Sequence, residues 1–186
     1  HQLLGFVGKS ESTISEVNLT ELTEEAIQLI SHEVQKRDIR VARQMGPLPD
    51  TIWSDAYQIR QVLLNLLTNA MHAVNSEGTI TIALEDVGDS QAITVNDTGQ
   101  GIARENLDKI FEPFFSTKSP GQGTGLGLFV SRGIVEKIGG TIEVVSKIGQ
   151  GARFSIRLPK HLNGTDEFNE SRGENWVETI KSRLTE

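Results

Sequence analysis

Cysteine is absent from the 186 residues of this chain, which excludes disulfides, thiolate chemistry and zinc–thiolate sites. The absence is also compatible with a reducing compartment. No apolar run approaches the roughly 20 residues that cross a bilayer as a helix, and no secretory leader opens the chain. Basic residues are outnumbered by acidic ones, 18 to 25, which argues against a nucleic-acid surface held by phosphate contacts. We therefore expect a cytoplasmic segment that contacts neither a membrane nor nucleic acid.

The length fits one domain with a short extension at each end. Residues 1–15 are predicted to be the end of a helix that arrives from elsewhere, and residues 16–160 to be the folded domain. Residues 161–186 read as a polar, glycine-containing linker followed by a short helix from Trp176. The chain begins abruptly at His1, as a piece of a longer protein would if its other part carried a membrane anchor or a sensor.

The spacing of apolar residues predicts an alternation of helices and strands inside the domain. Thr20 is the expected N-cap of the first helix. The last two strands are predicted to form a hairpin that turns Phe154, Ile156 and Leu158 inward. The expected helices span residues 20–36, 61–75 and about 126–138, and the expected strands span residues 16–19, 39–45, 79–84, 93–95, 141–145 and 153–158.

The helix predicted from Gln61 to Asn75 is apolar almost all round, apart from one narrow polar stripe. No Lys, Arg, Asp or Glu occurs in this segment, although the solvated stripe of an amphipathic helix is usually charged. At 100° per residue the stripe consists of Gln58, Gln61, Asn65, Asn69 and His72. We therefore expect it to face a pocket, not open water.

Asp97 follows Ile93 and Val95 with the period of two that places all three on one buried face of a strand. The glycines of the next residues, in D-T-G-Q-G, allow a tight turn and let a flat ligand approach the backbone closely. Asp97 is thus placed to accept a hydrogen bond from a ligand's amino group, as adenine would supply. The alternative is an Asx-type turn at a strand end, because D-x-G is common in turns.

A second glycine group, from Gly121 to Gly127, precedes a predicted helix. Backbone N–H groups at a glycine-rich helix start attract phosphate. The group is not a Walker A loop, because no Gly-Lys-Ser/Thr follows, and Leu126 stands where a Rossmann fingerprint has its third glycine. A flexible glycine linker is the alternative, which the firm helical pattern that follows disfavours.

Between the glycine groups lies F-E-P-F-F-S-T-K, residues 111–118. Its phenylalanines and proline predict a hinge that packs when closed, with residues 116–123 as a mobile lid over a ligand. Lys118 could reach phosphate oxygens from there. The alternative is an ordinary aromatic core turn with a solvated lysine.

Asn69 offers a neutral oxygen to a hard cation, and Asn65 lies beside it one helical turn earlier. Mg²⁺ commonly takes few protein ligands, because nucleotide phosphates and water complete its octahedron. For an isolated pair of helical asparagines, plain hydrogen bonding is the better interpretation. The agreement of four separate elements shifts the balance to a magnesium–nucleotide site.

Four motifs in this order give the chain a specific resemblance. They are N-L-L-T-N-A (65–70), D-T-G-Q-G (97–101), F-E-P-F (111–114) and G-T-G-L-G-L (123–128). The chain resembles the catalytic ATP-binding domain of bacterial sensor histidine kinases from about residue 16 to 159, and its F-F-S-T-K lid resembles kinases of the nitrogen-regulation type. The resemblance implies an α+β fold, the α/β sandwich of the Bergerat kind. Such a fold has a mixed, mostly antiparallel sheet with helices on one face, and ATP lies between the helices and a flexible lid.

The resemblance also implies a role for each matching residue. Asn69 would bind Mg²⁺, Asn65 would support the metal or the phosphates, and both would take part in catalysis. Asp97 would bind adenine, in a pocket shaped by Gly99 and Gly101. Other positions that the resemblance places at the nucleotide are His72, Ile102, Phe114, Lys118, Gly123, Thr124, Gly125, Leu126 and Gly127.

Two departures from the family pattern bear on these roles. The family often has lysine or arginine where His72 stands, so a phosphate contact there would depend on pH. Many relatives have threonine where this chain has Ala152, so a water-linked hydroxyl contact to the base is lost.

The reaction that the resemblance implies is transfer of the ATP γ-phosphoryl group to a histidine, and then to an aspartate of a response regulator. The acceptor histidine would lie in a dimerisation domain before His1, of which residues 1–15 would be the end, in a homodimeric kinase. His32 is expected to be a surface histidine, because the proline of a phosphoacceptor box is missing after His32-Glu33.

Two other functions stay open from the sequence. A hydrolytic ATPase of the same superfamily would use glutamate to activate water where Asn65 stands, and an amide cannot act as that base. A degenerate nucleotide-binding module would only dock partners.

Overall fold

The computed structural model describes residues 13–46, 50–74, 77–118 and 123–161. The helix end predicted for residues 1–15 therefore lies almost wholly outside the described residues, as does the linker and helix predicted for residues 161–186. Within the described residues, no helix is both long and apolar enough to cross a membrane.

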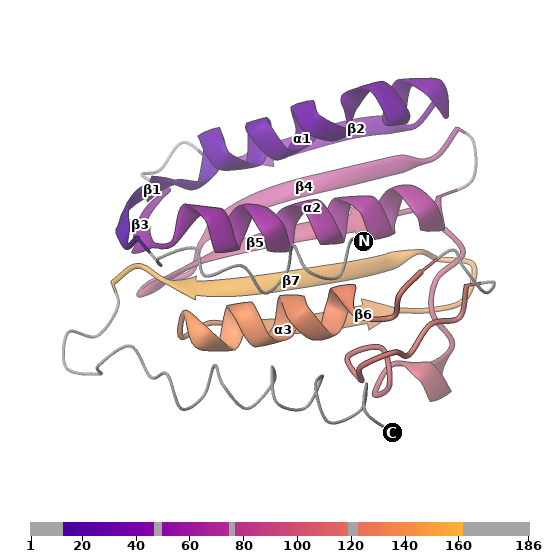
Figure 1. Cartoon of the computed structure of the whole chain (residues 1–186). Coiled ribbons are helices and arrows are strands. Elements are labelled where there is room, and N and C mark those ends of the chain that lie inside the picture. Colours follow the sequence, from indigo (N-terminus) through magenta and orange to yellow (C-terminus); the bar gives the residue numbers. More distant parts are fainter. Residues whose placement is uncertain (1–12, 47–49, 75–76, 119–122, 162–186) are drawn as a thin grey trace.

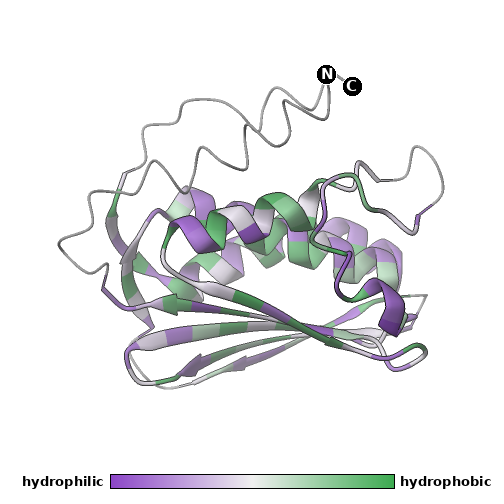
Figure 2. Ribbon diagram, turned by 90° about the horizontal axis from the view of Figure 1, so that it is seen from below, coloured by the Kyte–Doolittle hydropathy of each residue, from purple (hydrophilic) through white to green (hydrophobic). Residues whose placement is uncertain are grey.

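The described residues form a sheet covered by helices on one face, with a small two-stranded sheet at one end (Figure 1). Figure 2 shows the helices on a single side of the main sheet. The helices are α1 (Leu19–Lys36), α2 (Ala56–Ala73) and α3 (Gly127–Lys137). The strands are β1 (Ser15–Asn18), β2 (Arg40–Met45), β3 (Thr51–Ser54), β4 (Thr79–Asp86), β5 (Ser90–Asp97), β6 (Thr141–Ser146) and β7 (Ala152–Pro159). The predicted α+β sandwich is confirmed.

The strands of the main sheet follow the order β2-β4-β5-β7-β6. β2 pairs with β4 in parallel, and the other neighbours are antiparallel, so the sheet is mixed and mostly antiparallel. The small sheet is β1 paired with β3. This order puts β5 in the middle of the main sheet, and the carboxyl end of β5 therefore has a neighbouring strand on both sides.

The core lies between the helices and the inner face of the sheet. In β5 and β7 every second residue is buried, as the alternation of the sequence predicts. The inner side chains of β7 are Phe154, Ile156 and Leu158, which confirms the predicted hairpin orientation. α2 runs along the middle of the layer and buries Ile59, Leu63, Leu66 and Leu67 almost completely.

The helix starts differ from two predictions. Asn18, not Thr20, caps α1, because its Oδ1 accepts a hydrogen bond from the N–H of Glu21 at 2.9 Å. The Thr20 N–H instead donates to Asp50 Oδ2 at 2.7 Å. α2 begins at Ala56, five residues before the predicted start, because Asp55 accepts from the N–H groups of Tyr57 and Gln58 and caps the helix there.

Candidate ATP-binding site

Asp97 ends β5 with its side chain buried, 3% exposed, on the face that carries Ile93 and Val95. Its Oδ1 accepts hydrogen bonds from the N–H of Gly99 at 2.8 Å and from the N–H of Ala152 at 3.3 Å. The first of these is the Asx-type bond of the alternative interpretation, so that turn does form. No described residue donates to Oδ2, which leaves one oxygen of a buried carboxylate for a donor from outside the protein.

Burial raises the pKa of the Asp97 carboxyl, and the two backbone hydrogen bonds from Gly99 and Ala152 oppose the rise. A carboxylate in this position gains from an added donor, because each hydrogen bond to the charged form offsets its lost hydration. The electrostatics around Asp97 therefore favour a ligand that presents an N–H group to Oδ2.

The loop after Asp97 is fastened on both sides, and two glycines make this possible. A Cβ on Gly99 would lie 2.3 Å from the carbonyl oxygen of Ala73, at the end of α2. Gly101 has φ +73°, and a Cβ there would lie 2.1 Å from the carbonyl oxygen of Lys147 in the β6–β7 turn. Protein backbone fills the space that these side chains would take, so the glycines let the loop after Asp97 pack closely on both sides.

Ser146, at the end of β6, also holds this loop in place. Its Oγ accepts a hydrogen bond from the N–H of Ile102 at 2.8 Å and donates one to the carbonyl oxygen of Gly151 at 2.6 Å. Ile102 is half-buried and packs against the core. Sequence reasoning missed Ser146, because a serine at the end of an edge strand carries no signal of such a bridge.

The residues of the polar stripe of α2 have different partners along the helix. At the start of the helix, Gln58 Nε2 donates to the capping carboxylate of Asp55 at 3.1 Å. In the middle, Asn65 Nδ2 donates to Oγ of Ser131 on α3 at 2.8 Å. Asn69 is half-buried and makes no hydrogen bond to the described residues through its side-chain amide. Its oxygen is therefore available to a ligand.

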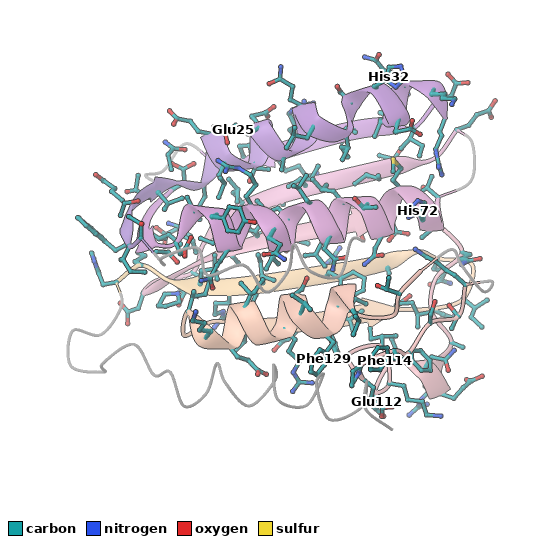
Figure 3. All side chains as sticks on the ribbon, in the orientation of Figure 1. Glu25, His32, His72, Glu112, Phe114 and Phe129 are labelled. Carbon is teal, nitrogen blue, oxygen red and sulfur yellow. The ribbon has the colours of Figure 1, made fainter. Side chains whose placement is uncertain are left out.

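At the end of α2, His72 meets the first part of the predicted lid. Its Nδ1 lies 3.4 Å from Nζ of Lys118, so the structure brings together two residues that the sequence predicts at the nucleotide. Burial, and then the charge of Lys118, lower the pKa of His72. Burial also lowers the pKa of Lys118. Figure 3 shows His72 near the end of α2 that lies away from its capped start.

The second glycine group leads into α3, and residues 119–122 of the predicted lid lie outside the described residues. Gly123 and Thr124 are exposed, whereas the side chain of Leu126 is buried in the core, 8% exposed. Leu126 can therefore contact a ligand only through its backbone. No side chain of the described residues caps α3, so its first N–H groups are free to meet an anion.

Two of these glycines are tightly enclosed. Gly125 has φ +67°, and a Cβ there would lie 2.4 Å from the carbonyl carbon of Phe114. A Cβ on Gly127 would lie 2.2 Å from Oδ1 of Asn65. The Gly127 backbone thus approaches the amide of Asn65 closely, which places the start of α3 directly beside the stripe of α2.

The phenylalanines of F-E-P-F-F separate into packed and exposed ones. Phe111 and Phe115 pack against the core, and Arg132 of α3 lies 5.5 Å above the ring of Phe111. Phe114 is 40% exposed and has a φ of 65°, which is unusual for a bulky residue. Figure 3 shows Phe114 gathered with Glu112 and Phe129 at the start of α3.

A family model decides what this arrangement is. Residues 54–162 match the model for the histidine kinase-, DNA gyrase B-, and HSP90-like ATPases, which is more than half of the chain. The chain belongs to this family. The matched segment begins at the end of β3, just before α2, and contains Asp97 and the second glycine group, so it holds the candidate site.

Known relatives place this ATPase domain among the sensor histidine kinases. Sensor histidine kinase ZraS of Salmonella typhi is 42% identical over 159 residues, which are 85% of this chain and 34% of that protein. AtoS, a signal-transduction histidine-protein kinase of Escherichia coli K12, is 37% identical over 88% of this chain and 27% of its own length. The chain thus spans about a third or less of the length of these relatives.

Solved structures agree with the sequence relatives. The catalytic domain of histidine kinase ThkA, in a nucleotide-free form, superposes with a TM-score of 0.73 at 36% identity, over 80% of this chain and 97% of that domain. Full-length ShkA, solved in complex with AMPPNP, superposes with a TM-score of 0.72 at 30% identity, over 82% of this chain and 32% of that chain. This histidine-kinase catalytic domain therefore has the fold and the ATP-binding character that its motifs imply.

The close approach of Gly127 to Asn65 leads to a testable prediction for this ATPase domain. We expect Gly127→Ala to fold normally, because the clash falls on the end of a side chain that can move. The displaced Asn65 amide should weaken Mg-ATP affinity by about tenfold. Isothermal titration calorimetry measures the change.

Gly46→Ala is the matched control, because the one contact that a Cβ there would make with the described residues is with the Leu84 carbonyl oxygen, at an ordinary 3.8 Å. Equal affinities in the two variants would contradict the prediction.

Proposed function

We propose that this chain binds Mg-ATP between α2, the loop after β5 and the start of α3, and transfers the γ-phosphoryl group to a histidine of a separate dimerisation domain. The observation that carries the proposal is the pairing of Asp97, which has a free carboxylate oxygen on a buried wall, with the Asn65–Gly127 contact on the other side. The Asp97 oxygen suits the amino group of adenine. The Asn65–Gly127 contact brings the N–H groups at the start of α3 beside the amides of α2, and such N–H groups bind phosphate.

Mg²⁺ fits the residues that are present. Asn69 offers a half-buried amide oxygen to which no described residue donates, and an oxygen ligand is what this hard cation prefers. The described residues include no group of three or more His, Cys, Asp or Glu that could hold a metal by themselves. We propose that Asn69 binds the ion together with the nucleotide phosphates, and that the ion balances phosphate charge.

The remaining residues of the site are proposed to position the nucleotide. Lys118 and His72 lie together where they can contact phosphate oxygens. Gly123, Thr124, Gly125 and the Leu126 backbone would line the phosphates, and Ile102 and Phe114 the rest of the pocket. Phosphoryl transfer depends mainly on such positioning and electrostatics.

The phosphoryl acceptor is proposed to be a histidine outside the described residues. His32 is not the proposed acceptor, because the proline of a phosphoacceptor box is missing after His32-Glu33. It lies on the outer surface of α1 with a side chain that is 87% exposed (Figure 3). We propose that the parent kinase is a homodimer in the cytoplasm. Its phosphoryl group would pass to a response regulator, since ThkA, 32% identical with a TM-score of 0.69, was solved in complex with response regulator protein TrrA.

Hydrolysis of ATP is a weaker candidate for the main activity. A hydrolytic relative needs a base near the γ-phosphate, and Asn65 is an amide whose nitrogen is engaged by Ser131. Slow turnover of bound ATP is therefore expected when no acceptor is present.

The proposal is tested by mixing the chain with γ-labelled ATP, Mg²⁺ and a separately purified acceptor-histidine domain. We expect acid-labile label on the acceptor domain and none on the chain itself. His32→Asn should label the acceptor equally well. Label retained on the chain, or an unlabelled acceptor despite ATP binding, would count against a kinase that acts on a separate domain.

A further inference from the structure

Ser131 is a buried polar residue in an apolar helix contact. It lies on α3 with 2% of its side chain exposed, and Val130, Ile134 and Val135 around it are buried as well. A hydroxyl in such a place costs free energy unless it is hydrogen-bonded, and packing alone would be served by alanine. The hydroxyl of Ser131 has a partner across the helix contact, which is Nδ2 of Asn65 at 2.8 Å.

This bond holds the side chain of Asn65 against α3. With Nδ2 held by Ser131, Oδ1 lies on the side of Gly127, where a Cβ would be 2.2 Å from Oδ1 and 3.2 Å from Nδ2. No described residue donates a hydrogen bond to Oδ1. The acceptor end of the amide is therefore presented to the first turn of α3, and the donor end is turned into the protein.

We propose that Ser131 is a positioning residue, whose hydroxyl anchors the side chain of Asn65 beside the start of α3, where it meets the bound Mg-ATP. The inference rests on the proposed function of Asn65. Without this bond the side chain of Asn65 can leave its place beside Gly127 by rotating about its side-chain bonds. A residue that fixes the orientation of a group at a metal–phosphate site typically changes affinity or activity by about 10- to 100-fold.

The first measurement uses the nucleotide-free chain. The side-chain NH₂ signals of Asn65 in a ¹H–¹⁵N NMR spectrum are assigned by their loss in Asn65→Asp. We expect Ser131→Ala to shift this pair of signals, while the pair of Asn69, which has no hydrogen bond to a described residue, stays in place. An Asn65 pair that does not move in Ser131→Ala would overturn the inference.

The second measurement is a double-mutant cycle on Mg-ATP affinity by calorimetry. Ser131→Ala should weaken binding by about tenfold in the natural chain and by less than about twofold in the Asn65→Ala background. Ile138→Val is the matched control for packing, because Ile138 is 1% exposed at the other end of α3. It should lower thermal stability without changing affinity in either background.

The outcomes separate this inference from the proposed function. If Asn65→Ala binds Mg-ATP as tightly as the natural chain, the role proposed for Asn65 is wrong, and so is the orientation argument built on it. If Asn65→Ala is weakened and Ser131→Ala is not, only the inference fails. Equal losses for Ser131→Ala in both backgrounds would mean that the serine acts through packing.

Discussion

Asp97→Asn is expected to lower ATP affinity by more than about a hundredfold while the domain remains folded. In the structure Oδ1 of Asp97 accepts from the N–H groups of Gly99 and Ala152, and no described residue donates to Oδ2, where we propose that the amino group of adenine binds. An asparagine has one acceptor and one donor end in place of two acceptors. In one orientation its NH₂ faces the adenine amino group, and in the other it faces the two backbone N–H groups. Either way two donors oppose each other in a buried place. Calorimetric titration with ATP measures the loss.

Two controls make the Asp97 prediction specific. Asp89→Asn makes the same chemical change in the exposed turn before β5 and should leave affinity unaltered. GTP carries an acceptor where ATP carries the amino group, so Asp97→Asn should lose less affinity for GTP than for ATP. An unchanged ATP affinity in Asp97→Asn, or equal losses for both nucleotides, would refute the assignment of adenine to Asp97.

The pKa of Asp97 adds a pH dependence with a definite sign. Burial raises this pKa, and the amino hydrogen bond needs the carboxylate form. As the pH falls through the raised pKa, the free protein becomes protonated at Asp97 and ATP affinity should fall with it. The Asp97→Asn variant lacks the group and should lack this part of the pH dependence.

The elements and the wall of the pocket follow from patterns that are local in the sequence. Alternate residues of a strand face the same side of the sheet. Asp97 follows the buried Val95 by two positions in β5, so the alternation predicts that Asp97 is buried as well. The apolar periodicity of α2 and α3 likewise predicts their packed faces and places the glycine group at a helix start. The fold and most of the candidate site can be predicted in this way, because each sequence pattern lies within one helix, strand or loop.

The contacts between helices, strands and loops could not be predicted from the sequence. Ser131 bonds to Asn65, which lies 66 positions away in the sequence, and Ser146 bonds to Ile102, which lies 44 positions away. No local sequence pattern around either serine indicates its partner. The cap of α1 differs from the predicted one for a related reason. Both Asn18 and Thr20 are good caps, and the pairing of Asn18 with Thr51 in the small sheet decides where the strand stops and the helix starts.

Asn69→Ala is the second variant for which a large loss is expected. Asn69 lies one turn after Asn65 on the stripe, and no described residue takes up its amide. Because it is the protein oxygen proposed to bind Mg²⁺, its removal should slow Mg²⁺-dependent phosphoryl transfer to a supplied acceptor domain by at least about a hundredfold. ATP binding without Mg²⁺ should change little, since Asp97 and the glycine loop remain. Label transfer and calorimetry with and without Mg²⁺ measure the two effects separately.

Gln61→Ala is the matched control for Asn69→Ala, because it removes an amide from the same stripe two turns earlier and away from the glycine loop. It should leave both measurements near those of the natural chain. If Asn69→Ala still phosphorylates the acceptor at the natural rate, Asn69 does not bind the metal. If it loses ATP affinity equally with and without Mg²⁺, its amide contacts the nucleotide directly, and the metal must then be held by the phosphates and other residues. Only a loss confined to the Mg²⁺-dependent measurements matches the proposed role of Asn69, whose half-buried amide oxygen accepts from no described residue.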